Sequence, residues 1–163
     1  SENGLIFANS TYLGEGDVGG SGEADDRFGS SLAVGDFDGD FRDDLAIGTP
    51  YEDLGASNEN VDAGEITVLY GADAGFFDFA RTDYLTQGAI FGSTTYDQSG
   101  DIFGYALAAG DFDGSGQADL VIGVPGESLA VGGDPGAVLA LYGVLFGDGF
   151  ESQDTSAWSA VAP

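Results

Sequence analysis

Short apolar stretches recur along the chain in two sets with the same internal order. They lie between clusters of glycine, aspartate and proline, which is the pattern of β-strands joined by turns. No stretch shows the 3.6-residue period of an amphipathic helix. The first set comprises residues 28–35, 44–50 and 64–71, and the second comprises residues 103–110, 119–125 and 136–143. The pattern therefore predicts two consecutive units of three strands each.

A candidate for a fourth strand lies between the two units, at residues 88–96, which read GAIFGSTTY. Residues 4–12 read GLIFANSTY, so we expect a strand of the same kind near the start of the chain. Four short strands in a unit of about 40–75 residues are typical of β-propeller blades. We predict an all-β fold of two four-stranded, propeller-type blades.

The predicted units divide the chain into four parts. They are an outer strand with a Gly-rich loop (1–27), a first repeat (28–102), a second repeat without an outer strand of its own (103–143) and a tail (144–163). The Gly-rich loop, residues 13–27, is expected to be flexible and exposed. The sequence indicates no role for the tail.

Each unit has an acidic loop after its first strand candidate. The first loop reads DFDGDFRDD (36–44), and the second reads DFDGSGQAD (111–119), 75 residues later. Both have oxygen-bearing side chains at loop positions 1, 3, 5 and 9, and position 7 offers a backbone carbonyl. The candidate ligands are Asp36, Asp38, Asp40, Arg42 and Asp44 in the first loop and Asp111, Asp113, Ser115, Gln117 and Asp119 in the second. Calcium takes about 6–8 oxygens in flexible geometry, so we expect two calcium ions per chain.

A solvated acidic turn and an EF-hand both fit these loops less well. Asp-Gly favours turns, but the occurrence of two copies in the same context argues against turns without an ion. An EF-hand requires a bidentate glutamate at loop position 12. Ile47 and Ile122 occupy that position here, so the loops more closely fit a connection between two strands.

The charge of the chain limits its partners. The chain has 29 acidic residues against three arginines, for a net charge of −26. Such a surface repels nucleic acid and anionic membranes, and no run reaches the roughly 18 apolar residues of a membrane span. We therefore expect neither nucleic-acid binding nor membrane insertion.

The residue types that the chain lacks exclude several catalytic centres. It contains no histidine, lysine or cysteine, which removes Ser-His-Asp and Cys-His triads, Schiff-base lysines and zinc sites built on those ligands. Paired carboxylates can hydrolyse glycosides, but the two loops already account for most clustered acids. We expect no enzymatic activity.

These motifs resemble the FG-GAP repeat, which builds the propeller of integrin alpha subunits and occurs in many secreted bacterial proteins. The resemblance covers FG at 28–29, SLAVGDFDGDFRDDLAIGTP at 31–50, their counterparts from 103 to 125, and the strands ending in LYG at 71 and 143. It implies four-stranded blades with calcium held in the hairpin loop between the first two strands. It also implies a place outside the cell or on the cell surface.

The chain departs from the family pattern at two loop positions. Phe41 stands where the family usually has glycine, which predicts strain in the first loop. Ser115 replaces an acid, which predicts a weaker second site or one that relies on water.

Two blades are fewer than the 4–8 or so of known propellers. An open sheet edge can accept a strand from another chain. We expect residues 4–12 of one subunit to complete the second blade of the next, which gives a ring or a filament of identical subunits. The alternatives are an adhesin-like module that binds a glycan or protein ligand, and a fragment of a longer propeller.

Overall fold

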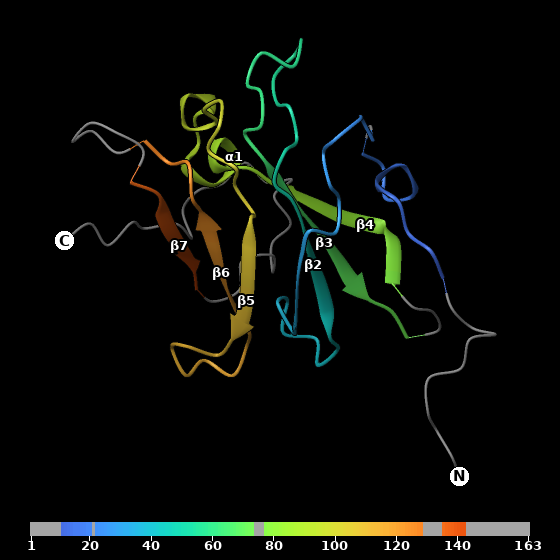
Figure 1. The fold of residues 1–163 in the computed structure, drawn as a ribbon. Coiled ribbons are helices and arrows are strands. Elements are labelled where there is room, and N and C mark those ends of the chain that lie inside the picture. Colours follow the sequence, from blue (N-terminus) through green and yellow to red (C-terminus); the bar gives the residue numbers. More distant parts are fainter. Residues whose placement is uncertain (1–10, 21, 74–76, 129–134, 143–163) are drawn as a thin grey trace.

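The fold consists of two antiparallel sheets that lie side by side (Figure 1). The computed structural model describes residues 11–20, 22–73, 77–128 and 135–142. Blade 1 has the strand order β1-β2-β3-β4, and blade 2 has the order β5-β6-β7. The strands are β1 (Ser31–Gly35), β2 (Asp44–Thr49), β3 (Glu65–Gly71), β4 (Phe77–Leu85), β5 (Ala106–Gly110), β6 (Asp119–Val124) and β7 (Ala137–Leu141). The helices are short: η2 (Glu15–Asp17), α1 (Gln87–Phe91) and η3 (Thr94–Tyr96).

The three predicted strands of each unit are confirmed. β1 pairs with β2 and β2 with β3 in blade 1, and β5, β6 and β7 pair in the same way in blade 2. The first hairpin of each blade closes at an equivalent pair, Gly35 with Asp44 and Gly110 with Asp119. None of the helices in the described ranges is long and apolar enough to cross a membrane.

The prediction of a strand at residues 88–96 is wrong. This stretch forms α1 and η3, and the fourth strand of blade 1 is β4, nearer to β3 in the chain. Thr86 begins α1 because its side-chain oxygen accepts a hydrogen bond from the Ala89 amide at 3.1 Å, and Gly92 ends it with φ 72°. β4 is an edge strand in which only Leu85 is buried, so its sequence lacks the apolar run that the prediction relied on.

The Gly-rich loop is not uniformly exposed, in contrast to the prediction. Val18 is buried, and with Leu13 and Phe28 it packs on Ile47 and Leu69 of blade 1. The Tyr84 hydroxyl of β4 also donates a hydrogen bond to the Val18 carbonyl. This segment therefore covers one side of blade 1. Residues 4–10 of the predicted N-terminal strand (4–12) and all of the predicted tail (144–163) lie outside the described residues.

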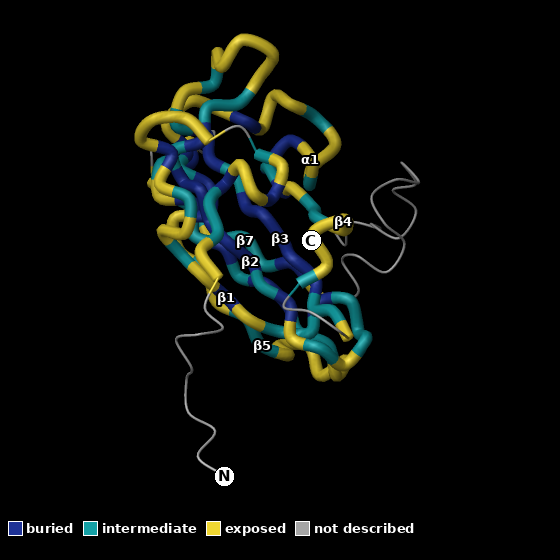
Figure 2. The backbone as a smooth tube through the Cα atoms, turned by 90° about the vertical axis from the view of Figure 1, so that its right-hand side faces the viewer, coloured by how far each residue is buried: buried dark blue, intermediate teal, exposed yellow. Residues whose placement is uncertain are grey.

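The core lies where the two blades pack on each other. The forward face of blade 1 is the side that carries Ala46, Ile66, Val68 and Tyr70. The rear face of blade 2 is the side that carries Leu120, Ile122 and Leu141. These side chains form one buried cluster, and Figure 2 shows the buried course of β3 as a dark blue stretch between exposed loops. Ser31 in β1 also donates a hydrogen bond to the Gly104 carbonyl at 2.6 Å.

Backbone segments of the two blades come into direct contact at Gly64. Its φ is 89°, and a Cβ there would lie 2.3 Å from the carbonyl oxygen of Phe103. We expect Gly64→Ala to lower the free energy of unfolding by about 2–4 kcal/mol, because a left-handed backbone costs about 1–2 kcal/mol and overpacking about 1–3 kcal/mol. Gly29 is a matched control, since its φ is 84° but a Cβ there would meet no atom within 4 Å. Urea unfolding should show a loss of only about 1 kcal/mol for Gly29→Ala, and equal losses would contradict the close contact.

Candidate metal centre

Both acidic loops lie at the same end of the molecule, where each connects the first two strands of its blade (Figure 1). The loops touch, because the Ala118 amide donates a hydrogen bond to the Asp36 carbonyl at 2.9 Å. Gln117 also lies against Gly39, where a Cβ would come within 2.0 Å of its side-chain nitrogen. The strand pairing therefore presents two acidic loops next to each other.

The first loop is wrapped around the carboxylate of Asp36. This group accepts hydrogen bonds from the amides of Gly39, Asp40 and Phe41 at 2.7, 3.0 and 2.9 Å. Asp36, Asp38 and Asp40 each offer one oxygen, and these oxygens all lie within 4.8 Å of one another. Two oxygens on opposite sides of a calcium ion are separated by about 4.8 Å, so the three carboxylates suit such an ion.

The second loop has the same local structure. Asp111 accepts hydrogen bonds from the amides of Gly114 and Gly116 at 2.7 and 3.0 Å. Oxygens of Asp111, Asp113 and Asp119 lie within 4.8 Å of one another. Ser115 instead accepts a hydrogen bond from the Gln117 amide at 3.3 Å. Use of the position-7 carbonyls, on Arg42 and Gln117, stays a prediction.

The ninth-position acids are buried and hold their loops closed. Asp44 accepts hydrogen bonds from the Phe37 amide at 2.8 Å and the Gly71 amide at 2.9 Å. Asp119 accepts hydrogen bonds from the Phe112 amide at 2.7 Å and the Asp113 amide at 3.3 Å. Burial raises the pKa of Asp44, and the two amide donors oppose that rise. In the first loop Asp44 lies outside the group of three acids, whereas Asp119 belongs to the group in the second loop.

Arginine side chains reach the first loop, which the sequence did not predict. Arg42 forms ion pairs with Asp40 and with Asp73, and Arg81 of β4 forms one with Asp38. The guanidinium carbon of Arg81 also lies 3.7 Å from the centre of the Tyr70 ring. These cations compete with a metal ion for the carboxylates of the first loop. Within the described ranges no arginine pairs with Asp111 or Asp113 of the second loop. These two carboxylates therefore lack this competition, which opposes the weaker ion binding predicted from Ser115.

The strain predicted at Phe41 is present. Its φ is 69°, whereas the equivalent Gly116 has a φ of 91°. A residue with a Cβ pays about 1–2 kcal/mol for this left-handed conformation. The hydrogen bond from the Phe41 amide to Asp36 fixes the backbone at this point, so the loop keeps its shape despite the substitution.

A family model described as "FG-GAP repeat" matches residues 28–69 and 103–141. These ranges contain the acidic loop and the three confirmed strands of each blade, except for the last two residues of β3. The chain belongs to the FG-GAP repeat family. The matched ranges end before β4 and before residues 143–163, so the two acidic hairpins and the strand that follows each are the shared part of the FG-GAP blades.

The chain is similar to parts of several much longer proteins. The chain is 40% identical over 118 residues to phosphatidylinositol-glycan-specific phospholipase D of Rattus norvegicus, covering 71% of this chain and 12% of the relative. It is 37% identical over 101 residues to integrin alpha-PS2 of Drosophila melanogaster, covering 62% of this chain and 6% of that protein. It is 33% identical over 101 residues to integrin alpha-5 of Xenopus laevis, covering 62% and 8%. The chain thus spans about an eighth or less of the length of these relatives.

Proposed function

We propose that the chain is a non-enzymatic, calcium-binding structural module of an extracellular or cell-surface propeller, which associates with further blades, including those of its own copies. Calcium is supported by two loops that each bring three carboxylate oxygens within 4.8 Å and by membership in the FG-GAP family. The missing histidine, cysteine and lysine side chains support a role without catalysis. Turnover of a polysaccharide that depends on an acid outside both loops would contradict this part of the proposal.

The association of further blades is supported by one observation, the uncovered forward face of blade 2. In blade 1 the forward face is covered by blade 2, and Ile66 and Tyr70 are 0% and 1% exposed. The equivalent residues of blade 2, Val138 and Tyr142, are 73% and 59% exposed. Blade 2 therefore presents to solvent the kind of surface that, in blade 1, packs on a neighbouring blade.

The loop phenylalanines show the same asymmetry. Phe37 of the first loop is fully buried, and it belongs to the cluster between the blades. Its counterpart Phe112 is 57% exposed. A further blade packed on blade 2 would remove this apolar surface from water, at about 25 cal/mol for each Å².

The structure alters how such blades would join. β7 is the last strand of blade 2 among the described residues, so its outer edge is a place for strand addition. The choice of residues 4–12 as the donor rested on their likeness to residues 88–96, which form α1 and η3. The proposal therefore rests on face-to-face packing of blades. The side of blade 1 that carries Ile47 and Leu69 is covered by Leu13, Val18 and Phe28. A head-to-tail contact between subunits would use this side, so the segment from Leu13 to Phe28 would have to move away from it.

Sedimentation velocity in calcium tests the association. We expect the chain to form dimers or larger species, and we expect Val138→Asp to shift them toward monomer, because a charge would be buried at the centre of the contact. Val61→Asp is the matched control, since Val61 is 49% exposed in the loop between β2 and β3. A chain that stays monomeric at about 100 µM, or a Val138→Asp variant that assembles as the control does, would overturn self-association. If deletion of residues 1–12 abolishes assembly and Val138→Asp does not, the result would support strand donation by residues 4–12 instead.

A second candidate function is binding of a glycan or protein ligand in a hollow beside the first loop. The hollow is lined by Asp40, Arg42, Tyr70, Asp73, Asp78 and Arg81. Two guanidinium groups and several carboxylates at one place offer both donors and acceptors to a polar ligand. A glycan array with the wild-type chain and with Arg42→Ala tests this candidate, and equal profiles without a hit would exclude glycans.

A further inference from the structure

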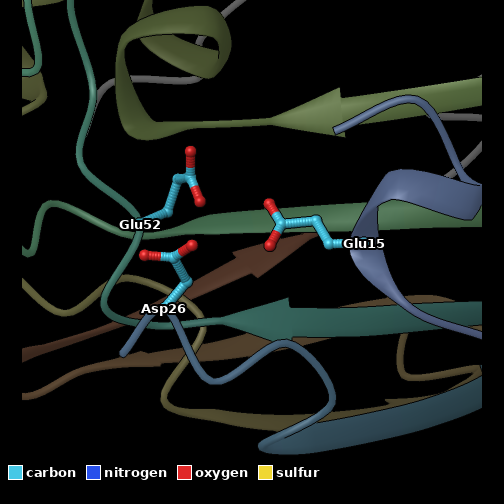
Figure 3. Close-up of side chains that lie close together, drawn as sticks. All are labelled: Glu15, Asp26 and Glu52. Carbon is cyan, nitrogen blue, oxygen red and sulfur yellow. The ribbon is translucent and has the colours of Figure 1, made fainter. Parts of the chain in front are cut away.

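Three acidic side chains outside the two loops meet beside blade 1. Glu15 comes from η2, Asp26 from the end of the Gly-rich loop and Glu52 from the loop after β2. Figure 3 shows their carboxyl groups turned toward one another from three separate segments. Each offers an oxygen within 4.8 Å of the others, and the three residues are only 8%, 4% and 8% exposed. Unlike an acidic turn at the surface, this cluster is withdrawn from water.

No arginine balances these carboxylates in the described part of the chain. All three arginines of the sequence lie within that part and contact other groups. Arg27 lies over the Tyr51 ring at 4.4 Å, and Arg42 and Arg81 form ion pairs with aspartates of or near the first loop. Burial of several carboxylates without a counter-charge is costly, so the cluster must hold either protons or a cation.

One oxygen of the cluster lacks any hydrogen-bond donor. Oε2 of Glu52 is buried and unpartnered, and the Glu52 carboxyl group faces Glu15 and Asp26 (Figure 3). Buried polar atoms in native proteins almost always have a partner. A buried carboxyl group that has an unpartnered oxygen and lies beside two further carboxylates therefore points to a positively charged ligand at their centre.

A shared proton is the competing occupant. Burial, followed by the nearby charge of Glu15, raises the pKa of Glu52 to about 8. Burial also raises the pKa of Glu15 and that of Asp26, and it raises the pKa of the neighbouring Glu65 to about 7. Glu15 and Glu52 are close enough to share a hydrogen bond when one of them is protonated. Metal ligands must be deprotonated, so a cation would have to displace that proton.

We propose that Glu15, Asp26 and Glu52 form a third calcium site, which fastens the Gly-rich segment to blade 1. The ligand set contains only oxygen, which selects hard cations, and the 4.8 Å limit on oxygen separations matches opposite ligands of calcium. Magnesium demands a near-ideal octahedron at about 2.0–2.1 Å, which three separate chain segments supply less readily. Glu15 and Asp26 lie on either side of Val18 in the chain, so the ion would hold the part of the chain that covers Ile47 and Leu69.

The third site is separate from the loop sites in residues and position, so its test is independent of theirs. Calcium titration of the full chain by calorimetry and native mass spectrometry at pH 7.5 should show three ions for the wild type and two for Glu52→Gln. Glutamine has the shape of the protonated side chain, so we expect this variant to fold. Glu23→Gln is the matched control, because Glu23 is exposed and close to Asp26, and it should keep three ions. The double variant Asp36→Asn, Asp111→Asn should keep the ion at the third site.

The outcomes separate the occupants. Equal calcium stoichiometry for Glu52→Gln and Glu23→Gln would overturn the proposal. A third site that binds magnesium but not calcium would also overturn it. One ion lost in Glu52→Gln from a chain whose loops bind none would support the third site and overturn the loop sites. Binding should also release protons at pH 7.5, seen as a dependence of the calorimetric heat on the ionisation enthalpy of the buffer, and this dependence should be smaller in Glu52→Gln.

The pH dependence of the melting temperature, measured in a chelator, tests whether the cluster holds a proton when no calcium is present. Glu52 has a folded-state pKa above its ordinary value of 4.5, so the folded chain binds more protons than the unfolded chain between about pH 4.5 and 8. The stability from this group is complete below about pH 4.5 and is lost as the pH rises through 8, and Glu15, Asp26 and Glu65 shift it in the same direction. The melting temperature should fall between pH 6 and 9, less in Glu52→Gln, and saturating calcium should reduce the fall. A fall that calcium leaves unchanged would show that the cluster holds protons only.

Discussion

Removal of calcium with a chelator should lower the melting temperature by about 10–20 °C. An ion present at about 100 times its dissociation constant stabilises the folded state by about 2.7 kcal/mol per site, and 1 kcal/mol corresponds to about 2–4 °C for a chain of this size. The two loops alone account for this effect, because three carboxylates within 4.8 Å in each loop repel one another once the ion leaves. Differential scanning calorimetry with and without added calcium measures the shift.

Two variants assign the shift to the loops. The double variant Asp36→Asn, Asp111→Asn removes the carboxylates around which both loops are wrapped, so most of the calcium-dependent shift should disappear. Asp43→Asn is the control, because Asp43 is exposed beside Asp44 and lies outside the acidic groups. Identical melting of the wild type with and without the chelator would exclude calcium as a stabilising ligand.

Asp44→Ala should lower the free energy of unfolding by about 3 kcal/mol, even in the presence of a chelator. The Asp44 side chain is buried and accepts hydrogen bonds from the amides of Phe37 and Gly71. Its removal leaves two buried donors without acceptors, and each such group costs about 1–3 kcal/mol. The bond to Gly71 also joins the loop to the end of β3, so this part of the effect does not depend on a metal ion.

Urea denaturation in excess chelator measures this effect separately from ion binding. Asp43→Ala should change the stability by less than about 0.5 kcal/mol, as most exposed substitutions do. If Asp44→Ala is as stable as Asp43→Ala in the chelator, then Asp44 acts only as a metal ligand. Asp97 would be unsuitable as a surface control, since it is buried and accepts a hydrogen bond from the Gly88 amide at 2.6 Å.

The repeated hairpins could be predicted from sequence because each carries its own local signals. The apolar stretches before and after each acidic loop fix where the strands begin and end, and Asp36 and Asp111 organise their loops through amides a few residues away. β4 was missed because an edge strand needs little apolar sequence. The stretch at 88–96 looked more strand-like, but the capping residues Thr86 and Gly92 direct it into a helix.

Contacts between distant segments could not be predicted from the pattern. Arg81 meets Asp38 only because β4 returns beside the first loop, and no local spacing relates the two residues. Glu15, Asp26 and Glu52 likewise meet across three segments that appear in the sequence as ordinary loop acids. The one visible hint was the presence of Leu13 and Val18 within a Gly-rich stretch, since apolar residues in a loop often pack on a neighbouring sheet.

The contact between the two acidic loops predicts thermodynamic linkage between calcium ions bound in them. The Ala118 amide bonds to the carbonyl of Asp36, and Gln117 lies against Gly39, so an ion that orders one loop also restricts its neighbour and lowers the entropy cost of ordering it. Charge acts in the other direction, because a first divalent ion lowers the negative potential that attracts the second ion. The two effects have opposite signs, and by linkage each acts equally on both ions. Where the ordering effect is the larger, we expect the paired loops to fill cooperatively, over a narrower range of calcium concentration than two independent sites would require.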